Sequence, residues 1–302
     1  MIAFGCSITE PEPYLQYSGP GIRRAAEPDS EIFAFAAVGT IGRSYNLLLE
    51  HAGGRDDLEA LVLVHPYAEI DDRELCAKVR AALRDSRVGV VGAAGATSVA
   101  SIAWWEGDVV SGSVRHRYQE YGGGEIPAFS WTQRQPPPAE VEVVDGWLMI
   151  LSPWVVRNVR FDEALGLGHG FDVDFCLQVR RTGRRVMVHD LGLIRNHDLE
   201  HVSDLALWVE AHIRMAEKWD AAMPARPAVE EVDWRQRARR AEAEREAARA
   251  IVNSRKYGYD ARLRPLEDAT ERLTKSTSWR ITEPLRRLNA WRRTRRLPAS
   301  AG

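Results

Sequence analysis

Four residues between positions 144 and 197 have types and spacing that suggest chemistry: Asp145, Asp172, Asp174 and His197. Asp145 interrupts an apolar stretch, and Asp172 and Asp174 lie where a loop passes into a helix. A carboxylate can take the proton of an attacking hydroxyl, and carboxylates with a histidine can bind a divalent cation. Acidic residues at the start of a helix also cap it, so spacing alone leaves capping and proton transfer equally open for this pair.

The first part of the chain alternates strands with helices, and these elements must position such a site. Apolar runs and helical spacing predict strands at 2–6, 31–38, 58–64 and 87–91, and helices at 41–51 and 72–83. Continuous apolar strands separated by amphipathic helices indicate a mostly parallel sheet covered on both faces. Ligands bind beyond the carboxyl ends of such strands, which directs attention to Cys6, Ser7 and His65.

Residues 97–140 break this pattern. The segment contains Trp104, Trp105, three consecutive glycines and three consecutive prolines, so it predicts a long loop or an irregular insertion. Regular patterns then return as a strand at 141–151 interrupted at Asp145-Gly146, a helix at 172–182, a strand at 185–189 and a helix at 203–219.

Composition limits the class of protein. The chain has 302 residues, of which 45% are hydrophobic and 28% charged, as is typical of a folded protein with a buried core. It has no apolar run of about 18 residues, and its N-terminus lacks the basic flank of a secretory signal. Three scattered cysteines do not suggest a disulfide or zinc framework, so a reducing cytoplasm is the expected compartment.

Charge is divided unevenly along the chain. Residues 1–233 carry 22 Lys and Arg against 35 Asp and Glu, whereas residues 234–302 carry 19 against 8. Nucleic-acid binding normally needs a basic face, so we expect no nucleic-acid partner for the predicted main domain, residues 1–225. Residues 226–302 are predicted to form a basic, helical extension with a role of its own.

The extension has two helical patterns. Residues 233–251 are rich in Ala, Arg and Glu and predict a helix whose apolar seam is thin for a coiled coil. Thr282 fits the N-cap of a later helix. The apolar positions of that helix fall on one face among arginines: Leu285, Leu288 and Trp291. Such a helix fits an anionic membrane surface, and it fits packing on the main domain equally well.

An ordered set of short motifs runs through the second half of the main domain. In chain order the motifs are Asp145-Gly146, Phe161-Asp162-Glu163, Phe171-Asp172-Val173-Asp174-Phe175, Thr182-Gly183 and His197. The set resembles the second half of a family 2 glycosyltransferase domain of GT-A fold, in the subgroup named for a streptomycin-biosynthesis protein. Residues 87–96 are similar to the central strand of that subgroup, and 277–287 resemble a tail motif of bacterial surface-polysaccharide glycosyltransferases. The resemblance covers about residues 1–220 and this tail motif.

The resemblance implies an α/β GT-A fold and transfer of a sugar, with inversion, from a nucleotide diphosphate sugar to a glycan or lipid-linked acceptor. The base is then Asp172, which matches the first Asp of the family's acidic motif, or Asp174. Such enzymes normally neutralise the leaving diphosphate with Mn²⁺ or Mg²⁺, and His197 matches a histidine that can complete the metal site. The implied setting is surface polysaccharide or glycoconjugate synthesis at the inner face of the cell membrane.

One position departs from the family pattern. The subgroup usually has His-Gln-Asp where this chain has His65-Pro66-Tyr67, so a neutral phenol replaces the carboxylate. A phenol is a poor ligand for a hard cation. The predicted metal ligands are therefore His65, His197 and Glu69. Glu69 would have to supply the carboxylate that is missing at position 67, or else Asp71 or Asp72 would. Otherwise the enzyme binds metal weakly, works without it or is inactive.

The resemblance also indicates substrate contacts. The residues predicted to bind the donor are Cys6, Ser7, Glu10, Asn46 and His65. Ordinary turn and capping roles explain the same residue types, so each of these roles stays open. The residues predicted to contact the acceptor are Asp145, Trp104 and Trp105. Exposed aromatic rings stack on sugars, although burial is the commoner fate of tryptophan.

Two other functions stay open at this point. Tyr67 favours an inactive GT-A domain that binds a nucleotide sugar or glycan, or that scaffolds other enzymes through its extension. A nucleotidyltransferase would need a glycine-rich phosphate loop near the N-terminus, which the sequence does not contain. Substitution of Asp172 separates the inactive domain from an active transferase, because a binding protein tolerates the loss of a base.

Overall fold

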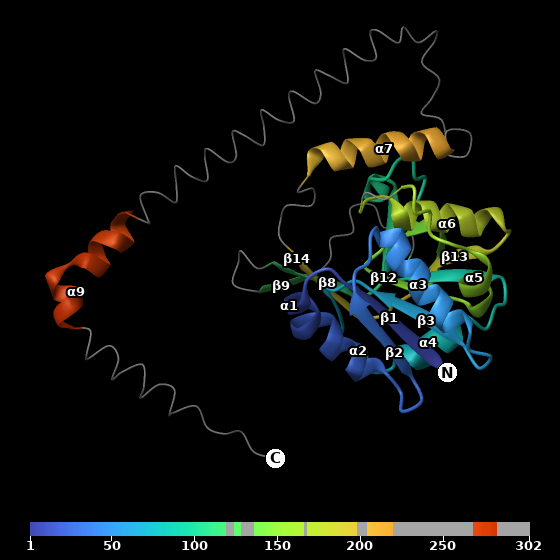
Figure 1. Ribbon diagram of the computed structural model, residues 1–302, viewed down its shortest axis with the longest axis horizontal. Helices are drawn as coiled ribbons and strands as arrows, with labels where there is room; N and C mark the ends of the chain where they lie inside the picture. The colour runs from blue at the N-terminus through green and yellow to red at the C-terminus, as the bar shows by residue number, and fades with distance from the viewer. Residues whose placement is uncertain (119–123, 128–135, 166–167, 198–203, 220–267, 283–302) are drawn as a thin grey trace, which may run out of the picture. The chain divides into compact units, whose positions relative to one another are not determined.

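The computed structural model describes residues 1–118, 124–127, 136–165, 168–197, 204–219 and 268–282 (Figure 1). The chain divides into two compact units, Met1–Pro227 and Ala228–Gly302. Within the described ranges, no helix is long and apolar enough to cross a membrane.

The first unit is built on a seven-stranded sheet with the order β10-β13-β5-β12-β3-β1-β2. Its strands are β1 (Ile2–Ile8), β2 (Glu31–Ala36), β3 (Ala60–Val64), β5 (Val88–Gly92), β10 (Ala139–Val141), β12 (Leu148–Leu151) and β13 (Arg185–Val188). Strands β10 and β12 run antiparallel to the other five. The mostly parallel sheet predicted from the apolar strand pattern is therefore confirmed.

Helices cover this sheet because its strands are apolar on both faces. Every residue of β3 and of β5 is buried. Helix α3 (Ile41–Gly53) begins after Thr40, whose hydroxyl accepts a hydrogen bond from the Arg43 backbone N–H. It packs on β1 and on α5 (Pro153–Asn158), and α4 (Leu75–Ala82) precedes β5. The two helices predicted in this half of the domain are confirmed.

Two smaller sheets correct the prediction for residues 97–140. Their strands are β4 (Ala68–Ile70), β6 (Ala94–Thr97), β7 (Asp108–Ser111), β8 (Val114–Tyr118), β9 (Gly124–Pro127), β11 (Val143–Val144) and β14 (Leu193–His197), in the orders β11-β6-β7 and β4-β14-β8-β9. The prediction of a long irregular insertion is wrong, because β7, β8 and β9 lie within it. Strand β8 has the polar sequence VRHRY and pairs with the distant β14, so no local apolar pattern marks it.

The first unit contains further helices and helical turns. They are α1 (Pro11–Pro13), a π-helical turn (Tyr14–Ser18), α2 (Gly19–Ala25), a 3₁₀ turn (Trp104–Glu106), α6 (Phe171–Arg181) and α7 (Leu205–Trp219). Of these, α6 packs on β5, β11 and β13. Gly170 precedes α6 with a left-handed φ of 77°, which favours glycine. Helix α7 buries Ala211, Met215 and Trp219 and runs beside α6 (Figure 1). The helices predicted at 172–182 and 203–219 are thus confirmed.

The second unit contains helical residues at 268–275 and α9 (Thr277–Ile281). Thr282 ends α9, and its hydroxyl donates to the Ser278 carbonyl oxygen at 2.8 Å. The predicted helix at 233–251 and the apolar face formed by Leu285, Leu288 and Trp291 lie outside the described residues. The capping of a later helix by Thr282 therefore stays a prediction.

Candidate active site

The turn before β12 meets the carboxyl end of β3, because these two strands are antiparallel neighbours. The His65 backbone N–H donates to the Trp147 carbonyl oxygen over 3.0 Å, and the centres of the two side-chain rings lie 4.9 Å apart. The ring of Tyr67 follows, 5.9 Å from the ring of His65. Residues after β3 and residues before β12 therefore form two sides of one site.

Asp172 is held against this turn. Its Oδ2 accepts a hydrogen bond from the Gly146 N–H at 2.9 Å, and its Oδ1 accepts one from the Val173 N–H at 2.9 Å. Burial of the side chain raises the pKa of Asp172 to about 7, and the negative charge of Asp145 acts in the same direction. A carboxyl group with this pKa is divided between its acid and base forms near neutral pH, which suits a proton acceptor.

Gly146 brings its backbone unusually close to helix α6. A Cβ at this position would lie 2.5 Å from Cζ of Phe171 and 3.2 Å from Cβ of Asp172. The absence of a side chain is what lets the Gly146 N–H reach the Asp172 carboxylate. The Asp-Gly pair that marks a turn in the sequence therefore also orients the candidate base.

An ion pair lies beside the candidate base. Nη1 of Arg195 lies 3.2 Å from Oδ2 of Asp145, and the side chains are only 16% and 9% exposed. The guanidinium also lies over Trp147, with its carbon 4.5 Å from the ring centre. Arg195 and Trp147 are not predicted from the sequence, although both lie two residues from a motif position, His197 and Asp145 respectively.

Asp174 has a different environment from Asp172. Its Oδ1 accepts a hydrogen bond from the Trp219 indole N–H at 2.8 Å and lies 2.7 Å from Nζ of Lys218. Its Oδ2 accepts one from the Gln178 side-chain amide at 2.7 Å, and the residue is only 1% exposed. These contacts join α6 to the last turn of α7.

The predicted donor-binding residues at the end of β1 differ in exposure. Cys6 is buried with Sγ 3.8 Å from Oγ of Ser18, and burial raises the pKa of its thiol to about 12. Ser7 is buried too. Glu10 is exposed and accepts a hydrogen bond from the Tyr67 hydroxyl at 3.0 Å. Glu10 is therefore the member of this loop that the structure brings to the end of β3.

Asn46 forms hydrogen bonds with the Phe161-Asp162-Glu163 motif. Its side-chain nitrogen donates to the Phe161 carbonyl oxygen and to Oε1 of Glu163, both at 3.0 Å. Its Oδ1 accepts from the Phe161 N–H at 2.9 Å. The Phe161 ring in turn stacks on Phe175 of α6 at 4.0 Å between centres. Asn46 thus fixes the position of the loop that leads towards α6.

His65 is buried and lies within the influence of one positive charge, that of Arg195. Its Nδ1 accepts a hydrogen bond from the Tyr67 backbone N–H at 3.3 Å. Desolvation, followed by the positive charge of Arg195, lowers the pKa of His65 to about 4, so its ring is neutral at pH 7. The backbone of His197 belongs to β14, and its side chain lies outside the described part of the structure.

The carboxylates predicted to hold a metal ion are neutralised by basic side chains. Glu69 lies 2.9 Å from a nitrogen of Arg117 and 3.4 Å from one of Arg24. Asp71 is paired with arginines as well, and Asp72 with a lysine. Across the residues that the structure describes, no three His, Cys, Asp or Glu side chains form a group that could hold a metal ion.

The two tryptophans predicted to contact an acceptor lie against α7. Trp104 is buried, and its ring meets Trp105 edge-on at 6.1 Å between centres. The ring of Trp105 lies 5.6 Å from that of Trp208 in α7. These rings pack α7 onto the 3₁₀ turn, which is the structural role that burial of tryptophan favours.

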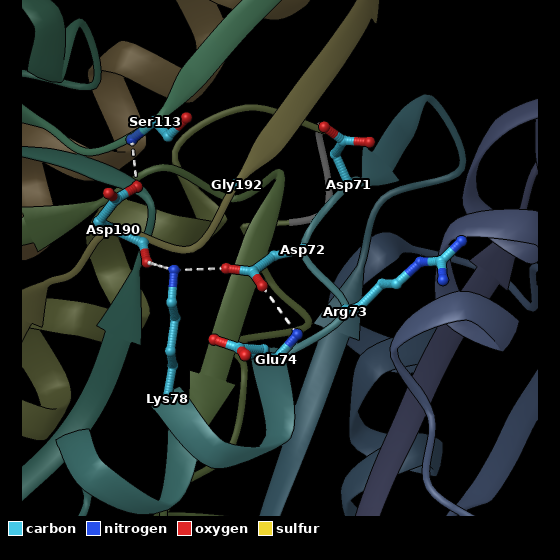
Figure 2. A pocket seen from close by; sticks show the side chains of 8 residues that line it. All are labelled: Asp71, Asp72, Arg73, Glu74, Lys78, Ser113, Asp190 and Gly192. Carbon is cyan, nitrogen blue, oxygen red and sulfur yellow. Dashed lines mark hydrogen bonds and ion pairs between the residues drawn. The ribbon is translucent and has the colours of Figure 1, made fainter.

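A polar cavity lies at the opposite end of β14 from His197 (Figure 2). It is lined by Asp71, Asp72, Arg73, Glu74, Lys78, Ser113, Asp190 and Gly192. Nζ of Lys78 lies 2.5 Å from Asp72 and donates to the Asp190 carbonyl oxygen at 3.0 Å. Asp190 also accepts from the Ser113 N–H at 2.7 Å, so these groups largely satisfy one another.

Comparison with known proteins identifies relatives of this chain. The sequence profile of the Glycosyltransferase like family matches residues 22–222. The streptomycin biosynthesis protein StrF of Streptomyces griseus is 29% identical over 203 residues, which cover 66% of this chain and 67% of that protein. The resemblance to the subgroup named for a streptomycin-biosynthesis protein is therefore confirmed.

Two solved glycosyltransferases align with most of the chain at low identity. GalNAc-T7 with UDP, GalNAc and Mn²⁺ gives a TM-score of 0.49 at 7% identity, over 72% of this chain and 48% of that one. The mannosyltransferase PcManGT of Pyrobaculum calidifontis, in complex with GDP-Man and Mn²⁺, gives 0.44 at 13% identity, over 72% and 64%.

The family profile spans most of the first unit, including both sides of the site around Asp172. The predicted α/β GT-A fold class agrees with this family and with the mostly parallel seven-stranded sheet. The chain therefore belongs to the glycosyltransferase-like family.

Proposed function

We propose that this protein is an inverting glycosyltransferase that moves a sugar from a nucleotide diphosphate sugar to a hydroxyl of a glycan or lipid-linked acceptor. The observation that carries the proposal is the buried carboxyl group of Asp172, which has a pKa of about 7 and is bonded to the turn before β12. Membership of the family supports sugar transfer. The neighbouring carboxyl end of β3 is where α/β enzymes of this kind bind their ligands.

In the proposed reaction the acceptor oxygen attacks the anomeric carbon while Asp172 takes the hydroxyl proton. The bond between the anomeric carbon and the diphosphate oxygen breaks, and the diphosphate leaves with the electron pair. Attack opposite the leaving group inverts the anomeric centre. The Gly146 N–H keeps the carboxylate in one orientation, which favours proton transfer at a fixed position. Asp174 is engaged by Lys218 and Trp219, so of the two carboxylates we assign the base to Asp172.

We also propose a setting in surface polysaccharide or glycoconjugate synthesis at the cytoplasmic face of the membrane. The proposal divides the chain into a transferase domain at 1–225 and a basic extension at 226–302. Its support is the tail motif at 277–287 and the excess of Lys and Arg after residue 233. Basic segments are attracted to anionic lipid, so peripheral contact through the extension would hold the domain near a lipid-linked acceptor.

A second candidate is a GT-A domain that binds a nucleotide sugar or glycan without turning it over. The observation that favours it is Tyr67, whose hydroxyl is hydrogen-bonded to Glu10 where the family pattern has a carboxylate. In this case the raised pKa of Asp172 would be a consequence of burial alone.

A screen with nucleotide diphosphates and nucleotide diphosphate sugars, in Mn²⁺, in Mg²⁺ and in EDTA, tests the proposed function. We expect binding of at least one diphosphate and slow release of its sugar to water. Binding with no release, in wild type and in Asp172→Asn alike, would favour the second candidate. If no compound of the panel binds, both sugar transfer and nucleotide-sugar binding would be contradicted, and a scaffolding role would be favoured.

The pH dependence of turnover should report the ionisation of Asp172. Only the ionised carboxylate accepts a proton, so kcat/KM should rise about tenfold between pH 6 and pH 8, with a midpoint near 7. Asp145→Asn removes the neighbouring negative charge, which lowers the pKa of Asp172 and moves the midpoint to lower pH.

The matched control for this profile is Glu50→Gln, an acid-to-amide change at an exposed position of α3, which should leave the midpoint in place. Initial rates at constant ionic strength from pH 5 to pH 9 make the measurement. A flat profile in wild type, or an Asp145→Asn midpoint above that of wild type, would contradict the assignment.

A further inference from the structure

Arg195 brings a fixed positive charge into the site. Its guanidinium rests on Trp147 and is ion-paired with Asp145, and its side chain is 16% exposed. Within the described ranges Asp145 is its sole ion-pair partner, and the buried Nε has no hydrogen-bond partner there. A guanidinium has five N–H donors, so Arg195 has more donors than its ion pair with Asp145 uses.

A divalent cation does not fit the described donor set at the end of β3. Tyr67 offers a phenol in place of a carboxylate, and Glu69 is paired with two arginines. His65 and Arg195 both contact the indole of Trp147, so the positive charge of Arg195 would oppose the binding of a metal ion at His65. Hard divalent ions prefer carboxylate oxygens that no other cation has neutralised.

We propose that Arg195 supplies the positive charge that faces the diphosphate of the donor, in place of the metal ion that the family pattern implies. The inference rests on the proposed function, because it needs a nucleotide diphosphate in this site. A guanidinium offers a planar fork of N–H groups that matches two phosphate oxygens. Asp145 and Trp147 hold that fork from one edge and one face, so its orientation is set before the donor binds.

The experiment measures binding of UDP, GDP, UMP and GMP by calorimetry, in EDTA and in Mn²⁺. For whichever diphosphate binds, we expect the wild-type affinity in EDTA to lie within about threefold of that in Mn²⁺. Arg195→Met should weaken binding of that diphosphate about 10- to 100-fold, the size expected for a charged hydrogen bond to phosphate. The corresponding monophosphate lacks the distal phosphate and should change less than about threefold.

Two further variants keep the test decisive. Arg195→Met removes the positive charge that is paired with the buried Asp145 and can unfold the protein. Asp145→Asn/Arg195→Met removes both charges together and should show the same loss of diphosphate binding. Arg185→Met removes an arginine from β13 that pairs with Glu140 and Asp85, and it should bind as wild type does.

The outcomes separate the two levels of the proposal. Diphosphate binding that needs Mn²⁺ and is unchanged in both Arg195 variants would overturn the role of Arg195 and leave the transferase proposal intact. Absence of diphosphate binding in wild type under every condition would overturn the proposed function and this inference with it.

Discussion

Asp172→Asn should lower kcat for sugar transfer by about 10²- to 10⁴-fold while leaving the affinity for the nucleotide diphosphate within about threefold of wild type. An amide has nearly the shape of the carboxyl group, and its single oxygen can still accept one of the two backbone hydrogen bonds, but it cannot take the acceptor proton. Product formation by mass spectrometry and diphosphate binding by calorimetry measure the two quantities separately.

The folded state of Asp172→Asn should be no less stable than that of wild type at pH 8. Since the pKa of Asp172 is about 7 in the folded chain and near 3.8 when exposed, its ionisation opposes folding as the pH rises from about 4 through 7. Asparagine does not ionise, and we expect the removal of this cost at pH 8 to offset the loss of one of the two backbone hydrogen bonds. The control is Asp29→Asn, at an exposed turn, which should retain full turnover. Turnover of Asp172→Asn within threefold of wild type would show that another group is the base.

Asp174→Ala should act on stability instead of chemistry, and its effect should also be large. The change removes the acceptor of three contacts, from Lys218, Trp219 and Gln178, inside a nearly fully buried site. Loss of one partner of a buried charged pair costs about 3–5 kcal/mol in the free energy of unfolding. The melting temperature should fall by roughly 10 °C.

Urea unfolding followed by tryptophan fluorescence gives the free energy, and Trp219 lies at the affected contact. Gln178→Ala removes one of the three contacts and should cost about 1 kcal/mol. At a temperature where Asp174→Ala remains folded, its kcat should stay within about fivefold of wild type. A loss of kcat as large as that of Asp172→Asn, with stability unchanged, would reverse the two roles.

The opposite fates of these two carboxylates follow from helix geometry. Residues two apart on an α-helix point about 200° away from each other, so Asp172 and Asp174 cannot serve one site from within α6. The sequence predicts both as candidates and leaves the choice open. The proposed assignment rests on their partners on other segments: Gly146 for Asp172 and the last turn of α7 for Asp174.

Local patterns predict the central sheet well because continuous apolar strands and amphipathic helices need only short-range information. They miss β7, β8 and β9. Strand β8, with the sequence VRHRY, has no apolar pattern and pairs with the distant β14 as well as with β9, so its own hydropathy does not mark it. Arg195 is missed for the same reason. Arg195 reaches the site because β14 pairs with β4 and β8 in the four-stranded sheet. A single arginine two residues before a motif histidine does not by itself indicate a site residue.

Gly146 has a consequence for which sequences this site can accept. A Cβ there would overlap the ring of Phe171, so even alanine at position 146 would push the start of α6 away from the turn and lengthen the bond to Asp172. We therefore expect a larger residue at 146 to be tolerated only together with a smaller one at 171. A relative with an isolated larger residue at 146 would carry its carboxylate in a different orientation, and its motif would no longer indicate the same proton acceptor.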